Sequence, residues 1–113
     1  MATSKQTLSF QRVQVAAPGT SVALAPQPYD NTETVIVYNR GSNTIRLGIG
    51  AAGGAVAIGD GTDIPSGASL ALPIGTLTNR PGPAFSGTNS LILDADGGAG
   101  DAQVTFMNVT GSK

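Results

Sequence analysis

Glycine and proline interrupt this chain so often that long helices have no room to form. Its 113 residues include 16 Gly and 7 Pro, and only residues 1–17 and 29–40 run for more than ten positions without either. In a helix interior, Gly costs about 1 kcal/mol and Pro about 3 kcal/mol relative to Ala. Short apolar runs between such turn signals are typical of a β-sandwich or barrel. We therefore predict an all-β chain with about eight short strands and little or no helix.

The clearest strand pattern lies in residues 34–49. Apolar side chains alternate with other residues on both sides of the polar segment 40–43, which carries turn chemistry. The alternating apolar positions are Val35, Val37, Ile45, Leu47 and Ile49. Period-2 spacing around a short polar loop that contains Gly is typical of a β-hairpin. We predict that these two strands pair with each other.

The N-terminal segment carries two apolar pairs of opposite parity. Leu8 and Phe10 form one pair, and Val13 and Val15 form the other. A β-bulge near residues 11–12 would bring both pairs onto one face, although a helix through this segment remains an alternative. The polar residues 1–6 are predicted to form a flexible arm, followed by a single β-sandwich domain over residues 7–113.

Further strands are predicted where apolar residues alternate later in the chain. They are expected at residues 22–24, 55–58 (a short edge strand), 70–74, 91–93 and 104–109. Turns are expected at residues 59–63 and 97–100, and residues 78–88 form the longest loop, a length that usually marks a functional or disordered segment. Among the aromatic residues, Phe10, Phe106 and Tyr38 are assigned to the core.

The charge content excludes two classes of partner. Charged residues make up 12 % of the chain, against about 25 % in ordinary domains, and the net charge is −1. The six basic residues are scattered singly, so we expect neither nucleic acid nor a membrane surface as a partner. The apolar runs are far shorter than the roughly 20 residues of a membrane helix. Residues 1–7 lack an apolar signal core, so we expect synthesis in the cytoplasm without secretion.

The missing residue types remove most catalytic chemistry. The chain has no Cys and no His, so it lacks a thiol nucleophile, the commonest general base and the commonest metal ligands. Its aspartates fall in predicted loops, where ordinary pKa values are expected. We therefore predict no enzyme activity, no catalytic residues and no cofactor. A surface rich in small polar residues instead suits contact with other protein.

Two motifs invite a ligand hypothesis. Residues 48–53 match G-x-G-x-x-G, but no helix pattern follows to hold a pyrophosphate, so we interpret them as a loop. Asp94, Asp96 and Asp101 surround a Gly-rich turn and offer oxygen ligands of the kind that Ca²⁺ prefers. The spacing departs from the EF-hand, and Asp and Gly also favour turns for conformational reasons alone. We predict no metal, with these three residues as a weak calcium candidate; Asp60 and Asp63 are weaker still.

Three stretches together resemble a known class of protein. They are Val-Ile-Val-Tyr-Asn-Arg-Gly-Ser-Asn-Thr-Ile-Arg-Leu-Gly-Ile (35–49), Ile-Pro-Ser-Gly-Ala-Ser-Leu-Ala-Leu (64–72) and Val-Thr-Phe-Met-Asn-Val (104–109). With these three stretches the chain resembles small β-rich structural proteins of tailed bacteriophages, and most of all a capsid decoration (cement) protein. The resemblance implies a jelly-roll-like β-sandwich that assembles as a homotrimer on the capsid exterior of a virion and binds the major capsid protein. The alternative is a tail-fibre, baseplate or receptor-binding, lectin-like β-module.

Candidate contact residues follow from exposure and composition. Lys5 and Gln6 lie in the predicted arm, and Arg80 and Phe85 lie in the long loop. For Phe85 two interpretations stay open: its ring plugs the sandwich, or it anchors a neighbouring protein.

Overall fold

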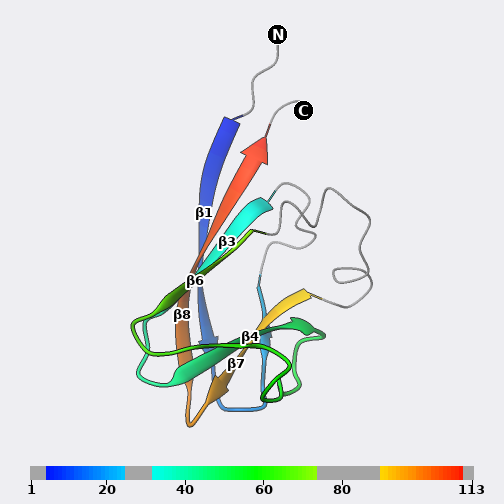
Figure 1. The fold of residues 1–113 in the computed structure, drawn as a ribbon, viewed down its shortest axis with the longest axis vertical. Helices are drawn as coiled ribbons and strands as arrows, with labels where there is room; N and C mark the ends of the chain where they lie inside the picture. The colour runs from blue at the N-terminus through cyan, green and yellow to red at the C-terminus, as the bar shows by residue number, and fades with distance from the viewer. Residues whose placement is uncertain (1–4, 25–31, 74–89, 111–113) are drawn as a thin grey trace.

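The computed structural model describes residues 5–24, 32–73 and 90–110, and in that part of the chain it contains strands and no helix. Within these residues, no helix has the length and hydropathy needed to cross a bilayer. The strands are β1 (Lys5–Val15), β2 (Val22–Ala23), β3 (Thr32–Asn39), β4 (Thr44–Gly50), β5 (Thr62–Ile64), β6 (Ser69–Leu72), β7 (Ser90–Asp96) and β8 (Gly100–Thr110). Figure 1 shows their arrangement.

The strands form two four-stranded antiparallel sheets. The strand orders are β1-β8-β3-β6 and β2-β7-β4-β5. Each strand of the first sheet therefore has a sequence neighbour at the same position in the second: β1 with β2, β8 with β7, β3 with β4, and β6 with β5. Eight strands wrapped in this way form a jelly roll. The predicted all-β, jelly-roll-like sandwich is confirmed.

The core lies between the two sheets and is built by alternation. Every second side chain of the central strands points inward, so that Val35 and Val37 on β3 and Val104 and Phe106 on β8 are almost completely buried. Ile45 and Leu93 on β4 and β7 close the core from the other side. The prediction that Phe106 belongs to the core is confirmed. Val35, Val37, Ile45 and Leu47 form the predicted buried face, but Ile49, which was expected on the same face, is 49 % exposed near the end of β4.

The predicted hairpin of residues 34–49 is wrong in its pairing. Both strands exist, but β3 pairs with β6 and β8, whereas β4 pairs with β5 and β7. The segment between them crosses from one sheet to the other. Alternation reports which face of a strand is buried, and two strands that face each other across a core show the same alternation as two paired strands.

The predicted bulge in β1 is also absent, and so is the helical alternative. β1 pairs with β8 in one uninterrupted register from Lys5↔Thr110 to Val15↔Gly100. Val13 and Val15 therefore point into the core, while Leu8 and Phe10 point to the outer face, where they are 55 % and 65 % exposed. The assignment of Phe10 to the core is wrong. Because β1 begins at Lys5, the strand also includes the last two residues of the expected arm; residues 1–4 lie outside the described residues.

Three smaller expectations also differ from the structure. Residues 55–58 form no strand; within this segment Val56 is buried and Ile58 is 83 % exposed. The turn expected at residues 59–63 instead leads into the short strand β5, which begins at Thr62 and pairs with β4. Tyr38 lies on the outer face of β3 with 43 % exposure instead of in the core.

The first sheet extends beyond the second. The beginning of β1 and the end of β8 run past β4 and β7 (Figure 1). At this boundary the inward side chains become polar: Asn108 donates to the hydroxyl of Ser9 at 3.0 Å and accepts from that of Thr32 at 2.8 Å. This row of hydrogen bonds ties three strands together where the apolar core stops.

Candidate interaction surface

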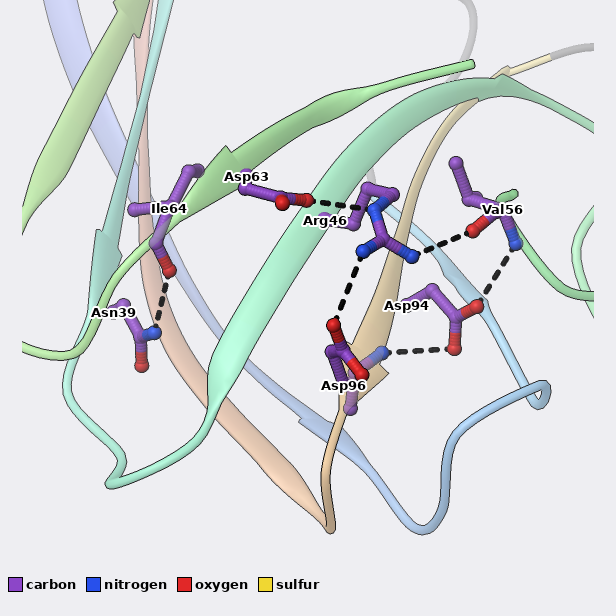
Figure 2. A network of polar contacts seen from close by, with 8 residues as sticks. Asn39, Arg46, Val56, Asp63, Ile64, Asp94 and Asp96 are labelled. Atoms are coloured by element: carbon purple, nitrogen blue, oxygen red, sulfur yellow. Dashed lines mark hydrogen bonds and ion pairs between the residues drawn. The ribbon is translucent and has the colours of Figure 1, made fainter. Parts of the chain in front are cut away.

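A polar network anchors the second sheet. Arg46 on β4 is only 5 % exposed, and its guanidinium donates to Asp63 at 2.6 Å, to Asp96 at 3.2 Å and to the carbonyl of Val56 at 3.0 Å. Figure 2 shows the guanidinium between these partners. The hydrogen bond that Arg46 donates to the Asp63 carboxylate raises the pKa of Arg46, so the group stays charged. Arg46 thus ties β5, β7 and the segment after β4 to one point.

Asp94 on β7 is a buried carboxylate held by backbone N–H groups. It is 2 % exposed and accepts hydrogen bonds from Gly19 at 2.9 Å and from Val56 and Ala95 at 2.8 Å each. Burial alone would raise the pKa of Asp94, but these three donors and the charge of Arg46 outweigh it and lower that pKa below its usual value. The carboxylate serves as an anchor for two loops, those that contain Gly19 and Val56.

Asn39 holds the crossing between β3 and β4. The side chain is fully buried, its amide nitrogen donates to the carbonyls of Asn43 and Ile64 at 2.8 Å each, and its oxygen accepts from the N–H of Gly41 at 3.0 Å. One side chain therefore satisfies the polar groups of a tight connection that leaves one sheet and enters the other.

The structure does not bring the calcium candidates together as a ligand set. Asp94 is occupied by N–H groups, Asp96 by Arg46, and Asp101, on β8, by Arg12 and Arg40. No group of three or more acidic side chains placed to hold a metal occurs within the described ranges. The expectation of ordinary pKa values is wrong for Asp94 and Asp101, because loop placement was inferred where β7 and β8 in fact hold these carboxylates.

An apolar patch covers the outer face of the first sheet. Its residues, here called the outer patch, are Leu8, Phe10, Ile36, Tyr38 and Met107. Across the sheet Leu8 is opposite Met107, while Phe10 and Ile36 flank Thr105 on either side. Leu8, Phe10 and Tyr38 are each more than 40 % exposed, and Ile36 and Met107 are half-buried. Contiguous exposed apolar groups with a polar border are typical of protein interaction sites.

Charged residues border the outer patch at one end. Arg12 makes two hydrogen bonds to the carboxylate of Asp101, at 3.1 and 2.9 Å, and Arg40 lies 3.6 Å from the same group. The hydrogen bonds from Arg12 are the main reason that the pKa of Asp101 is lowered. The patch therefore has an apolar centre and an ordered ionic edge, as protein interfaces commonly do.

A pocket of about 270 Å³ opens between the sheets near β4 and β6. Leucines from β4, β6 and β7 line it, together with the polar residues Asp60 and Thr62. No aromatic side chain occurs in the lining that the structure describes, whereas a saccharide site is expected to offer ring faces. The geometry gives the outer patch the stronger case as a functional surface.

The side chains of the sequence-predicted contact residues lie outside the described part of the structure. Lys5 and Gln6 belong to the first residues of β1, and only their backbone is described. Arg80 and Phe85 fall in residues 74–89, outside the described residues. Sequence reasoning missed the outer patch because it placed Phe10 and Tyr38 in the core. The parity change between Leu8–Phe10 and Val13–Val15 was the available signal, since an uninterrupted strand must then present one pair to solvent.

Comparison with known proteins adds no relative: no family model, curated protein sequence or solved structure matches the chain.

Proposed function

We propose that this protein is a structural, non-enzymatic component of a bacteriophage virion, which decorates the capsid exterior and stabilises it by binding the major capsid protein as an oligomer. The outer patch is the observation that carries this proposal. Leu8 and Phe10 on β1 and Tyr38 on β3 are exposed on the same outer face of the first sheet, on either side of β8, so they are available to a partner. The sequence resemblance to decoration proteins supplies the identity of that partner.

The fold and the polar network support the same role. Jelly rolls recur in viral capsid proteins. This support is by analogy, because lectins and cupins share the fold. Strand pairing and the hydrogen bonds of Asn108 to Ser9 and Thr32 hold β1, β8 and β3 together, so the sandwich presents the outer patch as a preformed surface. A preformed surface loses little conformational entropy on binding, which favours affinity.

The proposed mechanism is stabilisation by mass action. A protein that binds the assembled shell and not its separated subunits shifts the equilibrium toward the shell. An oligomer, predicted to be a homotrimer, multiplies each weak contact, because the second and third contacts form at high effective concentration. Few formal charges on the chain leave apolar and hydrogen-bond contacts as the main source of binding energy.

The first experiment is quantitative mass spectrometry of purified particles from the source. We expect copies of this chain in numbers comparable to those of the major capsid protein. A handful of copies per particle would replace decoration with the tail-fibre or baseplate alternative. Complete absence would refute a virion role, and screening against glycans would then test the lectin-like alternative.

A second experiment locates the binding surface. Tyr38→Lys places a charge within the outer patch, and Ile58→Lys makes the same change at an exposed apolar residue outside it. We expect Tyr38→Lys to weaken binding to undecorated capsids at least about 10-fold, because a charge is then desolvated in the interface, and Ile58→Lys to leave it unchanged. The double variant Arg80→Ala, Phe85→Ala tests the long loop in the same assay; unchanged affinity would exclude those two residues.

A further inference from the structure

Among the strands that the structure describes, the edge strands of the two sheets are very unequal in length. β2, β5 and β6 are edge strands of two, three and four residues, whereas β1 is an edge strand of eleven. Proteins protect exposed edges by keeping them short or by adding bulges, prolines and charges. β1 has no Pro and no bulge. Of its two charged residues, Arg12 is engaged by Asp101 on β8.

From this edge we infer that β1 is a self-association site, at which two copies of the chain pair their β1 strands antiparallel across a twofold axis. In the described part of the chain β8 is the only strand that pairs with β1. We assign a second copy of the chain as the partner because two antiparallel β1 strands can pair along their whole length without placing like charges opposite each other, as the register below shows. The two first sheets would then join into one eight-stranded sheet.

The register of this pairing follows from the bounds of the strand. Phe10 is the midpoint of Lys5–Val15, so a pairing that uses all eleven residues places Phe10 opposite its own symmetry mate. Leu8 then lies opposite Arg12, and Lys5 opposite Val15. Directly opposed residues share a face, so the outer residues of one copy meet the outer residues of the other.

The charges of the strand are compatible with this register. Arg12 and its symmetry mate are offset by four residues, or about 14 Å at about 3.4 Å per residue. That separation exceeds the Debye length of about 8 Å at physiological ionic strength. No like charges stand opposite each other, and the aliphatic stem of each Arg12 packs beside Leu8 of the other copy.

The axis also explains the most exposed ring of the sheet. Phe10, at 65 % exposure, gains an aromatic partner across the axis. The outer patches of the two copies, each of which begins at β1, become one continuous apolar surface. The inference concerns the isolated chain and does not depend on capsid binding. A twofold contact between β1 strands is also compatible with a homotrimer, since the contact would link a subunit of one trimer to a subunit of the next.

A charge-swap experiment at Phe10 tests the axis. We expect the wild-type chain to show a concentration-dependent mass in analytical ultracentrifugation, and Phe10→Lys and Phe10→Glu each to weaken association about 30-fold or more through loss of the ring and repulsion across the axis. Mixing the two variants should restore association, because opposite charges then meet at the axis. Ile58→Lys, a matched control outside the sheet, should associate as the wild type does.

Cysteine scanning provides a test that does not require strong association. The chain has no Cys, so a single introduced thiol has no competing partner. Phe10→Cys should form disulfide-linked dimers under mild oxidation, because opposed residues lie about 4.5–5.5 Å apart, within disulfide range. Leu8→Cys, on the same face, should not, because its symmetry mate is about 14 Å away.

Three results would overturn the inference. One is a wild-type chain that stays monomeric up to near-millimolar concentration. Another is an assembly whose mass Phe10→Lys leaves unchanged, since its contacts then lie elsewhere. The third is cross-linking of Leu8→Cys as efficient as that of Phe10→Cys.

Discussion

Replacing Asp94 by Asn tests whether the buried carboxylate anchors the two loops that reach it. The side chain has nearly the same shape, but an amide offers one acceptor oxygen instead of two. In the structure one oxygen of Asp94 accepts from Gly19 and Ala95, and the other accepts from Val56. Whichever way the amide turns, its NH₂ group faces at least one backbone N–H.

The expected loss follows from these three hydrogen bonds. A hydrogen bond to a charged group contributes about 1.5–3 kcal/mol, and an unsatisfied buried donor costs about 1–3 kcal/mol. Because two hydrogen bonds survive in weaker, uncharged form, we expect Asp94→Asn to lower the free energy of unfolding by about 2–4 kcal/mol. At about 4 °C per kcal/mol for a domain of this size, the melting temperature falls by roughly 8–16 °C.

Asp96→Asn is the matched control. It is the same substitution two residues along β7, at a side chain that is 53 % exposed and makes one 3.2 Å contact with Arg46. Exposed ion pairs contribute about 0–1 kcal/mol, so we expect a loss below about 1 kcal/mol. Urea denaturation of both variants gives the two free energies, and amide hydrogen exchange should show lost protection at Gly19 or Val56 in Asp94→Asn alone. Equal losses in the two variants would refute the anchoring role.

Three further predictions concern the other polar groups. Asn39→Asp should lower the free energy of unfolding by about 2–4 kcal/mol, because a carboxylate then faces two carbonyl oxygens that accept from the amide in the wild-type chain. Asn43→Asp, at a more exposed amide, should cost far less in the same urea assay. A similar cost for the two variants would contradict the role of Asn39. The free energy of unfolding should be flat from pH 6 to 8, since the chain has no His, and should fall below about pH 4. The pKa values of Asp94 and Asp101 are lowered in the folded state, so the unfolded chain binds protons first as the pH falls, and stability is lost. Thermal melts at pH 3 and pH 7 check this, and Asp94→Asn should reduce the difference between them. The melting temperature should be the same with Ca²⁺ and with a chelator, because Asp94, Asp96 and Asp101 are each engaged by donors of the chain; a chelator-sensitive melt would restore the calcium hypothesis.

The candidate surface was predictable neither in composition nor in position, because contact was expected through small polar residues and the outer patch is apolar. The expectation of contact with protein came from the low charge content and the many small polar residues. The residues chosen for that contact came from an expected arm and loop, whereas the structure presents Leu8, Phe10 and Tyr38 on a sheet face. The sequence assigns Phe10 and Tyr38 to the core only on the expectation that large apolar residues are buried. That assumption is weak, since apolar atoms make up more than half of a folded protein's exposed surface.

What the sequence alone determined is the local structure. Gly and Pro spacing excluded long helices, and period-2 alternation located most strands and their buried faces, including those around Val35 and Val104. Both signals are local, because they depend on backbone freedom and on which side of a strand is apolar.

Only the tertiary structure decided which strands pair. Whether β3 joins β4 in a hairpin or faces it across the core depends on how all eight strands bury their apolar sides together, and alternation is the same in both arrangements. The same global packing places β1 at an edge, where the uninterrupted register with β8 turns Phe10 outward. It also gathers Arg46, Asp63 and Asp94, which are distant in sequence, into one network that no local pattern encodes.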